Sequence, residues 1–216
     1  MDEVITQTGG DIDGDGQPEA IYGGDNQAER NLTEAYRSDG SLMWATNRPI
    51  DGWVRSANDR FELTADVDGD GRQEILVNNP VDKWTGLFKW EREALHTPWA
   101  SPSPIDGWQR SGEDAFFAAD IERVGRYDIV IANEGDGWMG VLNWDGAGLR
   151  IAWASPSPLT GPAGSWYLRR NDVFRTGPQE YRGQWAITIL RGSDNSNCVL
   201  FWQQNALQMV EVVGPH

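Results

Sequence analysis

Acidic side chains recur with one spacing in two segments of this chain, and that spacing suits a cation. Residues 11–19 have the sequence DIDGDGQPE, and residues 66–74, 55 positions later, have DVDGDGRQE. Each segment offers carboxylates at positions 1, 3, 5 and 9, and glycines at positions 4 and 6 let the backbone curl so that the position-7 carbonyl points inward. Such an all-oxygen cage is typical of a Ca²⁺ site. The predicted metal ligands are Asp11, Asp13, Asp15, Gln17 and Glu19 in the first loop, and Asp66, Asp68, Asp70, Arg72 and Glu74 in the second.

The sequence that follows each loop excludes a helical calcium motif. An EF-hand needs a bidentate Glu at loop position 12, where this chain has Tyr22 and Val77. Both loops continue instead into residues typical of β-strands, at 20–22 and 75–77. Each loop is therefore expected to join two strands, and the alternative to a metal site is a solvated Asp/Gly turn.

Two further loops carry weaker versions of the pattern. Residues 120–128 read DIERVGRYD, so that Asp120, Glu122 and Asp128 remain but Val124 replaces the third carboxylate. We expect at most a weak metal site there. In the fourth loop Arg182 stands where a ligand would be, which indicates that the site is lost.

The loops belong to a repeat that extends over the whole chain. The sequence WASPSPIDGW at 99–108 recurs as WASPSPL from Trp153 and, in weaker form, at 44–53. One unit contains four short apolar runs separated by Gly, Asp, Asn and Pro, without a period of 3.6, which predicts four antiparallel strands. Self-similarity at about 54 residues indicates an all-β propeller with four-stranded antiparallel blades. The blades are expected at 1–55, 56–110, 111–168 and 169–216, in a single repeat domain spanning 1–216.

The segment ADVDGDGRQEI at 65–75, with its counterpart in the first unit, resembles the FG-GAP or VCBS repeats of integrin α-like propellers. The stretch from Gly52 to Asp66 is also similar to the repeat of lectin propellers of the Psathyrella velutina type. This resemblance implies Ca²⁺ in the Asp/Gly loops and a sugar ligand. Those relatives have more than four blades, so it leaves open whether four units close alone or pair as a homodimer into an eight-bladed ring.

Tryptophan is unusually frequent, with 12 residues in 216. The hypothesis of carbohydrate binding rests on the tryptophans that are expected to lie in loops. Strand tryptophans are expected to pack between blades. Trp84 and Trp138 instead follow polar turns, each with an aspartate two residues before it. An exposed ring stacks on a pyranose while a carboxylate accepts its hydroxyl hydrogen bonds. The predicted sugar-binding residues, on the face opposite the metal loops, are Asp82, Trp84, Asp136, Trp138, Trp53, Trp108 and Trp166.

Composition limits the kinds of molecule that this chain is expected to bind. A net charge of −15 disfavours nucleic acid and anionic membrane surfaces. The single cysteine excludes an intrachain disulfide. The N-terminus lacks the basic and then apolar stretch of a signal peptide. Low-affinity Ca²⁺ loops nevertheless serve mostly outside the cell, which favours a secreted or periplasmic protein.

The sequence therefore predicts a calcium-binding propeller that binds carbohydrate as a lectin does. The alternatives are a polysaccharide-acting, lyase-like enzyme domain and a protein-interaction scaffold. No catalytic residue is predicted, because the chain has no nucleophile elbow, P-loop or dinucleotide fingerprint.

Overall fold

A computed structural model describes residues 6–23, 32–133, 135–155, 158–169, 172–181 and 184–214. Throughout these residues the regular structure is β-strand, and within each sheet consecutive strands of the chain pair antiparallel. The chain divides into two compact units, which are described separately: the first comprises Met1–Gly112 with Gly146–Gly148, and the second comprises Glu113–Asp145 with Leu149–His216.

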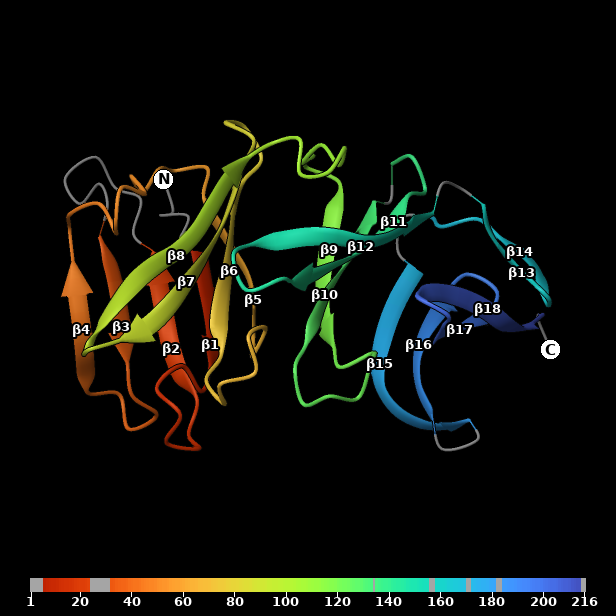
Figure 1. Ribbon diagram of the computed structural model, residues 1–216, viewed down its shortest axis with the longest axis horizontal. Coiled ribbons are helices and arrows are strands. Elements are labelled where there is room, and N and C mark those ends of the chain that lie inside the picture. Colours follow the sequence, from red (N-terminus) through yellow and green to blue (C-terminus); the bar gives the residue numbers. More distant parts are fainter. Residues whose placement is uncertain are drawn as a thin grey trace. The chain divides into compact units, whose positions relative to one another are not determined.

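The first unit contains two four-stranded sheets (Figure 1). The strands are β1 (Thr6–Gly10), β2 (Glu19–Gly23), β3 (Thr33–Tyr36) and β4 (Leu42–Thr46) in one sheet, and β5 (Arg60–Ala65), β6 (Glu74–Asn79), β7 (Trp84–Glu91) and β8 (Ala94–Pro102) in the other. The first strands of the two sheets, β1 and β5, lie side by side. The Asp/Gly loops follow these strands, and the Gln73 amide donates a hydrogen bond to the Asp11 carbonyl at 2.9 Å, so the two loops are neighbours.

Apolar side chains from both sheets form the core of this unit. Ile21 and Ile75 are completely buried, and Phe88 lies at the centre of an aromatic group. Its ring meets Trp53 edge-on at 5.9 Å and Phe61 at 6.2 Å between ring centres. These edge-to-face contacts suit large rigid rings between two sheets.

The second unit contains two four-stranded sheets and a short hairpin. The strands are β9 (Asp114–Ala119), β10 (Asp128–Asn133), β11 (Met139–Trp144) and β12 (Leu149–Ser155); the hairpin β13 (Leu159–Gly161) and β14 (Gly164–Trp166); and β15 (Asp172–Tyr181), β16 (Gln184–Arg191), β17 (Asn197–Gln203) and β18 (Ala206–Val213). The hairpin packs against β18 (Figure 1). It begins at Leu159, the last residue of the repeated WASPSPL segment.

The all-β fold with four-stranded antiparallel sheets is confirmed. Each four-stranded sheet lies within one of the four sequence units. Arg182 lies outside the described residues. No helix long and apolar enough to cross a membrane occurs among the residues described.

Candidate functional sites

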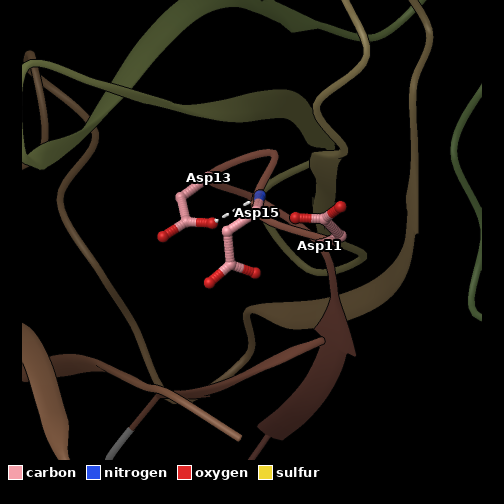
Figure 2. Close-up of side chains that lie close together, drawn as sticks. All are labelled: Asp11, Asp13 and Asp15. Atoms are coloured by element: carbon pink, nitrogen blue, oxygen red, sulfur yellow. Dashed lines mark hydrogen bonds between the residues drawn. The ribbon is translucent and has the colours of Figure 1, made fainter. Parts of the chain in front are cut away.

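The first Asp/Gly loop connects β1 to β2 and gathers three carboxylates. One oxygen from each of Asp11, Asp13 and Asp15 lies within 4.8 Å of the others, and Figure 2 shows the three side chains converging from one loop. Asp11 organises the turn, since its two carboxylate oxygens accept the Gly14 and Gly16 amides at 2.8 and 3.0 Å. Both glycines have positive φ, 83° and 87°, which a residue with a Cβ rarely adopts.

The base of the first loop is closed by a buried carboxylate. Glu19 is 2% exposed, and its Oε2 accepts the Ile12 amide at 3.0 Å. Burial is the main cause that raises the pKa of Glu19, and the nearby charge of Asp13 adds to it. The residues offer an oxygen-only donor set, which fits a hard cation.

The second loop, between β5 and β6, has the same backbone hydrogen bonds. Asp66 accepts the Gly69 and Gly71 amides at 2.7 and 2.9 Å, and Glu74 accepts the Val67 amide at 3.0 Å. One oxygen from each of Asp66, Asp68 and Asp70 again lies within 4.8 Å of the others.

A lysine distinguishes the second loop from the first. Lys89, on β7, extends its ammonium group to Asp68, to Asp70 at 2.8 Å and to Glu74 at 3.4 Å. Burial alone would lower the pKa of Lys89, but the hydrogen bonds that its ammonium group donates to the two aspartates outweigh it and raise that pKa. The lysine is therefore charged at neutral pH. Glu74, 2% exposed, has its pKa raised to about 7 by burial and by the charge of Asp68, against the opposing effect of Lys89.

The third loop, between β9 and β10, has a different arrangement. Asp120 still organises the turn, accepting the Val124 and Gly125 amides at 2.9 and 3.0 Å. Among the described residues, however, this loop does not bring three carboxylates within 4.8 Å of one another. Glu122 pairs with Arg126 at 3.7 Å. Burial and the charge of Glu122 raise the pKa of Asp128 to about 7.

A pocket of about 460 Å³ lies in the first unit. Trp84, at the start of β7, lines it and is 41% exposed. The lining residues are Asp51, Gly52, Trp53, Val54, Asp59, Asn79, Asp82, Trp84, Thr97 and Ala100. The structure thus brings three of the predicted sugar-binding residues, Trp53, Asp82 and Trp84, to one concave surface.

Beneath the pocket lies a buried corner centred on Asp59. Its Oδ2 accepts hydrogen bonds from Trp53 Nε1, Arg55 Nη1 and the Ser56 amide, each at 3.0 Å. Its Oδ1 accepts Asn79 Nδ2 at 2.8 Å. Asn79 also holds the pocket's edge, because its Oδ1 accepts the Asp82 amide at 2.8 Å and its Nδ2 donates to Asp82 Oδ2 at 3.1 Å. The corner therefore fixes the position of the Asp82 carboxylate.

The remaining predicted sugar-binding residues have different surroundings. The ring of Trp138 is half-buried and lies over Gly140, where an added Cβ would overlap it. Asp136 is exposed, and its Oδ1 accepts the Trp138 amide at 2.9 Å. The link tryptophans Trp53, Trp108 and Trp166 are 8%, 6% and 3% exposed.

No model of a known protein family matches the sequence, and no curated protein matches it. Solved structures do share its fold. β-Propeller enzymes are among them. The periplasmic gluconolactonase PpgL of Pseudomonas aeruginosa matches at a TM-score of 0.52 with 15% identity, over 96% of this chain and 56% of its own. The rhamnogalacturonan lyase PL11 of Bacillus licheniformis matches at 0.49 with 16% identity, over 98% of this chain and 51% of its own. The exotype rhamnogalacturonan lyase YesX matches at 0.43 with 15% identity, over 97% and 54%.

The likeness to the gluconolactonase, at a TM-score of 0.52, shows an all-β fold of the propeller type. The chain spans about half the length of the solved structures it matches.

Sequence reasoning missed two features of these sites. Lys89 has no sequence signature of a loop residue, because it lies on a strand 15 residues after Glu74 and reaches the loop only through the pairing of β6 with β7. The second is a pair at the pocket's edge: Asp51 Oδ2 lies 2.9 Å from His96 Nδ1 and accepts the Thr97 amide at 3.1 Å. The repeated Asp-Gly-Trp link contained Asp51, but its partner was not evident from the sequence.

Proposed function

We propose that this protein is a carbohydrate-recognising β-propeller and that the pocket of its first unit binds a saccharide. One observation carries the proposal: an exposed tryptophan, Trp84, and a positioned carboxylate, Asp82, line the same 460 Å³ pocket. The face of an indole ring packs against the C–H groups of a pyranose, and carboxylate oxygens accept hydrogen bonds from its hydroxyls. Sites of this type combine an apolar surface with a few fixed polar groups.

The buried corner supports the proposal through pre-organisation. Asp82 is exposed and would otherwise lose rotamer freedom when it bound a ligand. Hydrogen bonds from Asn79 to its carboxylate and from its amide to Asn79 hold it before binding. The cost of ordering the site is therefore met by the fold.

A glycan array tests the proposal, followed by titration of the sugar that binds. Trp84→Ala and Asp82→Asn should each weaken binding at least tenfold. The matched variants Trp138→Ala and Asp136→Asn, at the corresponding turn of the second unit, show whether that turn binds as well. If the folded Trp84→Ala protein binds every glycan that the parent binds, the pocket is not the sugar site.

We also propose that the first Asp/Gly loop gives the protein a Ca²⁺ requirement. The support is the oxygen-only donor set of Asp11, Asp13 and Asp15 and the buried Glu19 at the loop's base. Bound Ca²⁺ would supply charge neutralisation that stiffens the turn between β1 and β2. The sugar array run with and without EDTA shows whether binding depends on the ion, and melting curves under the same two conditions show whether the fold depends on it.

A second candidate function is a polysaccharide-acting enzyme, and it uses the same pocket. The solved structure matched at a TM-score of 0.52 is named a gluconolactonase, so its ligand is also sugar-derived. In this chain the favouring observation is the Asp51–His96 pair, because a carboxylate bound to Nδ1 fixes the imidazole so that Nε2 can accept a proton. The pair lies at the pocket's edge, where Asp51 and Thr97 line it.

Assays for product formation distinguish the two functions. An enzyme would convert a polysaccharide or a sugar lactone, and His96→Gln would abolish turnover while leaving binding largely intact. A binding protein would retain the sugar unchanged, and His96→Gln would have little effect on either measurement.

Assembly and location follow from the same proposal. A stack of sheets with open ends would expose apolar faces, so we propose a closed ring, either of four blades or of eight in a homodimer. Static light scattering distinguishes the two. A secreted or periplasmic location agrees with the periplasmic gluconolactonase of similar fold.

A further inference from the structure

Although the two Asp/Gly loops share their sequence pattern, their surroundings differ in charge. The second loop contacts the ammonium group of Lys89, whose side chain is 9% exposed. Among the described residues, no lysine or arginine forms an ion pair with Asp11, Asp13 or Asp15 of the first loop.

The ammonium group occupies the position that a cation would take. Its three contacts are Asp68, Asp70 and Glu74, which are positions 3, 5 and 9 of the predicted ligand set. Glu74 Oε1 is buried, accepts no hydrogen bond within the described part of the chain, and lies 3.4 Å from Lys89 Nζ. This carboxylate oxygen therefore faces the centre of the loop, where the Lys89 ammonium group lies beside it.

We infer that the two loops differ in their cation: the Lys89 ammonium group serves as the resident cation of the second loop, and a divalent cation binds at the first. This rests on the proposed calcium function of the first loop.

Charge and space exclude joint occupancy of the second loop. A divalent cation would need the same carboxylate oxygens, and it would repel an ammonium group held within a few ångströms. To make room for the ion, the buried Lys89 side chain would have to move its charge away from its three acidic partners, which is energetically costly. The intramolecular ammonium group is always present, whereas the divalent ion must be taken from solution.

Strand register identifies the residues of the other sheets that correspond to Lys89. Ile75 pairs with Phe88 and Ala20 pairs with Tyr36, so Arg37 follows Tyr36 as Lys89 follows Phe88. Arg37 is exposed, and no ion pair joins it to the described carboxylates of its loop. In the second unit Ile129 pairs with Leu142, and the corresponding residue is Asn143, which has no charge.

Calorimetric Ca²⁺ titration of the full chain tests the inference, with tryptophan-sensitised Tb³⁺ luminescence as a second count of sites. The wild type should bind one ion. Asp13→Asn should abolish that binding, and Asp68→Asn should leave it unchanged. Lys89→Met keeps the aliphatic stem but removes the charge, and should raise the count to two. Lys83→Met is the matched control and should bind one ion, because the Lys83 ammonium group donates to the Arg110 carbonyl at 2.8 Å and forms no ion pair with the carboxylates of either loop among the described residues.

Several results would overturn the inference. A wild-type count of two would do so, as would loss of the single site by Asp68→Asn rather than by Asp13→Asn. A folded Lys89→Met protein that still binds one ion would also contradict it. If Lys89→Met does not fold, the Asp13 and Asp68 variants decide the question alone. A wild-type count of zero refutes calcium binding at the first loop. In that case, a gain of one ion by Lys89→Met still supports the lysine as the cation of the second loop. If Lys89→Met gains no ion, the role of the lysine is refuted too.

Discussion

Replacement of Asp59 by alanine should destabilise the first unit more than any change at the pocket surface. Asp59 is 4% exposed and accepts hydrogen bonds from Trp53, Arg55 and Ser56 through a single oxygen. The Arg55 side chain is 2% exposed and would lose its carboxylate at 3.0 Å. Removing one partner of a buried ion pair costs about 3–5 kcal/mol, because the other charge remains buried. For a chain of this size each kcal/mol lowers Tm by about 2–4 °C, so a fall of roughly 6–20 °C is expected.

Thermal and urea unfolding, followed by circular dichroism, measure this loss. Asp82→Ala is the matched control: it removes an exposed carboxylate that accepts one hydrogen bond from Asn79, and should cost about 1 kcal/mol or less. The double variant Arg55→Met/Asp59→Ala should be more stable than the sum of the two single losses predicts, since it leaves no unpaired charge. Equal Tm values for Asp59→Ala and Asp82→Ala would refute the assignment of Asp59 as a structural corner.

Three further outcomes are expected. The Tm measured in millimolar Ca²⁺ should be higher than the Tm measured in EDTA. A free Ca²⁺ concentration of one hundred times Kd stabilises the folded state by about 2.7 kcal/mol for each site. Coincident melting curves would contradict the metal proposal. Trp90→Ala should cost about 3–5 kcal/mol because Trp90 is 7% exposed, whereas Trp84→Ala should cost less and lower sugar affinity; the reverse order would place Trp84 in the core. Gly161→Ala should destabilise the second unit by about 1–3 kcal/mol, because a Cβ there overlaps the Met209 backbone, while Gly192→Ala, with open space around it, should be neutral; equal Tm values would contradict the close packing of β13 on β18.

Local features of the sequence were sufficient to predict the four strands of each unit and the Asp/Gly turn, but not the hairpin of β13 and β14. The Asp/Gly loops lie between the first two strands of their sheets, as expected, because glycine at positive φ and an aspartate that accepts two amides define that turn locally. Trp84 lies at the end of a polar turn and is exposed. Each of these features depends on residues a few positions apart.

Features that depend on pairing between distant residues were not predictable in this way. Lys89 reaches Asp68 across 21 residues, and the contact requires the register between β6 and β7. An aspartate stands two residues before a phenylalanine at Asp59 and Phe61, and this spacing recurs in the chain. The sequence alone did not indicate what the aspartate does. Asp59 accepts hydrogen bonds from Trp53 and Asn79 only when the segment that connects β4 to β5 and the strand β6 are both folded against β5.

The corner also explains why an aspartate and a tryptophan occur together in the turns of two sheets. Asn79 and Asn133 each donate to the corner carboxylate, and each accepts the amide of the turn aspartate, Asp82 or Asp136, at 2.8 and 3.0 Å. An asparagine has both a donor and an acceptor, so one side chain links the buried corner to the exposed turn.

In the fourth sheet the corresponding residue is Arg191, which donates to Asp172 at 3.1 Å and lies over the Trp166 ring at 4.2 Å. A guanidinium group has no acceptor, and thus it cannot hold the amide of the turn that follows. That turn is held by its own Asp194, which accepts the Ser196 amide at 2.9 Å. Ser196 takes the place of the turn tryptophan, as shown by the equivalent backbone bonds from Arg191 to Ser196 and from Asn133 to Trp138. The acceptor and the tryptophan are thus lost together, which is the result expected if the asparagine serves to position an Asp-x-Trp turn for a ligand rather than to stabilise the sheet alone.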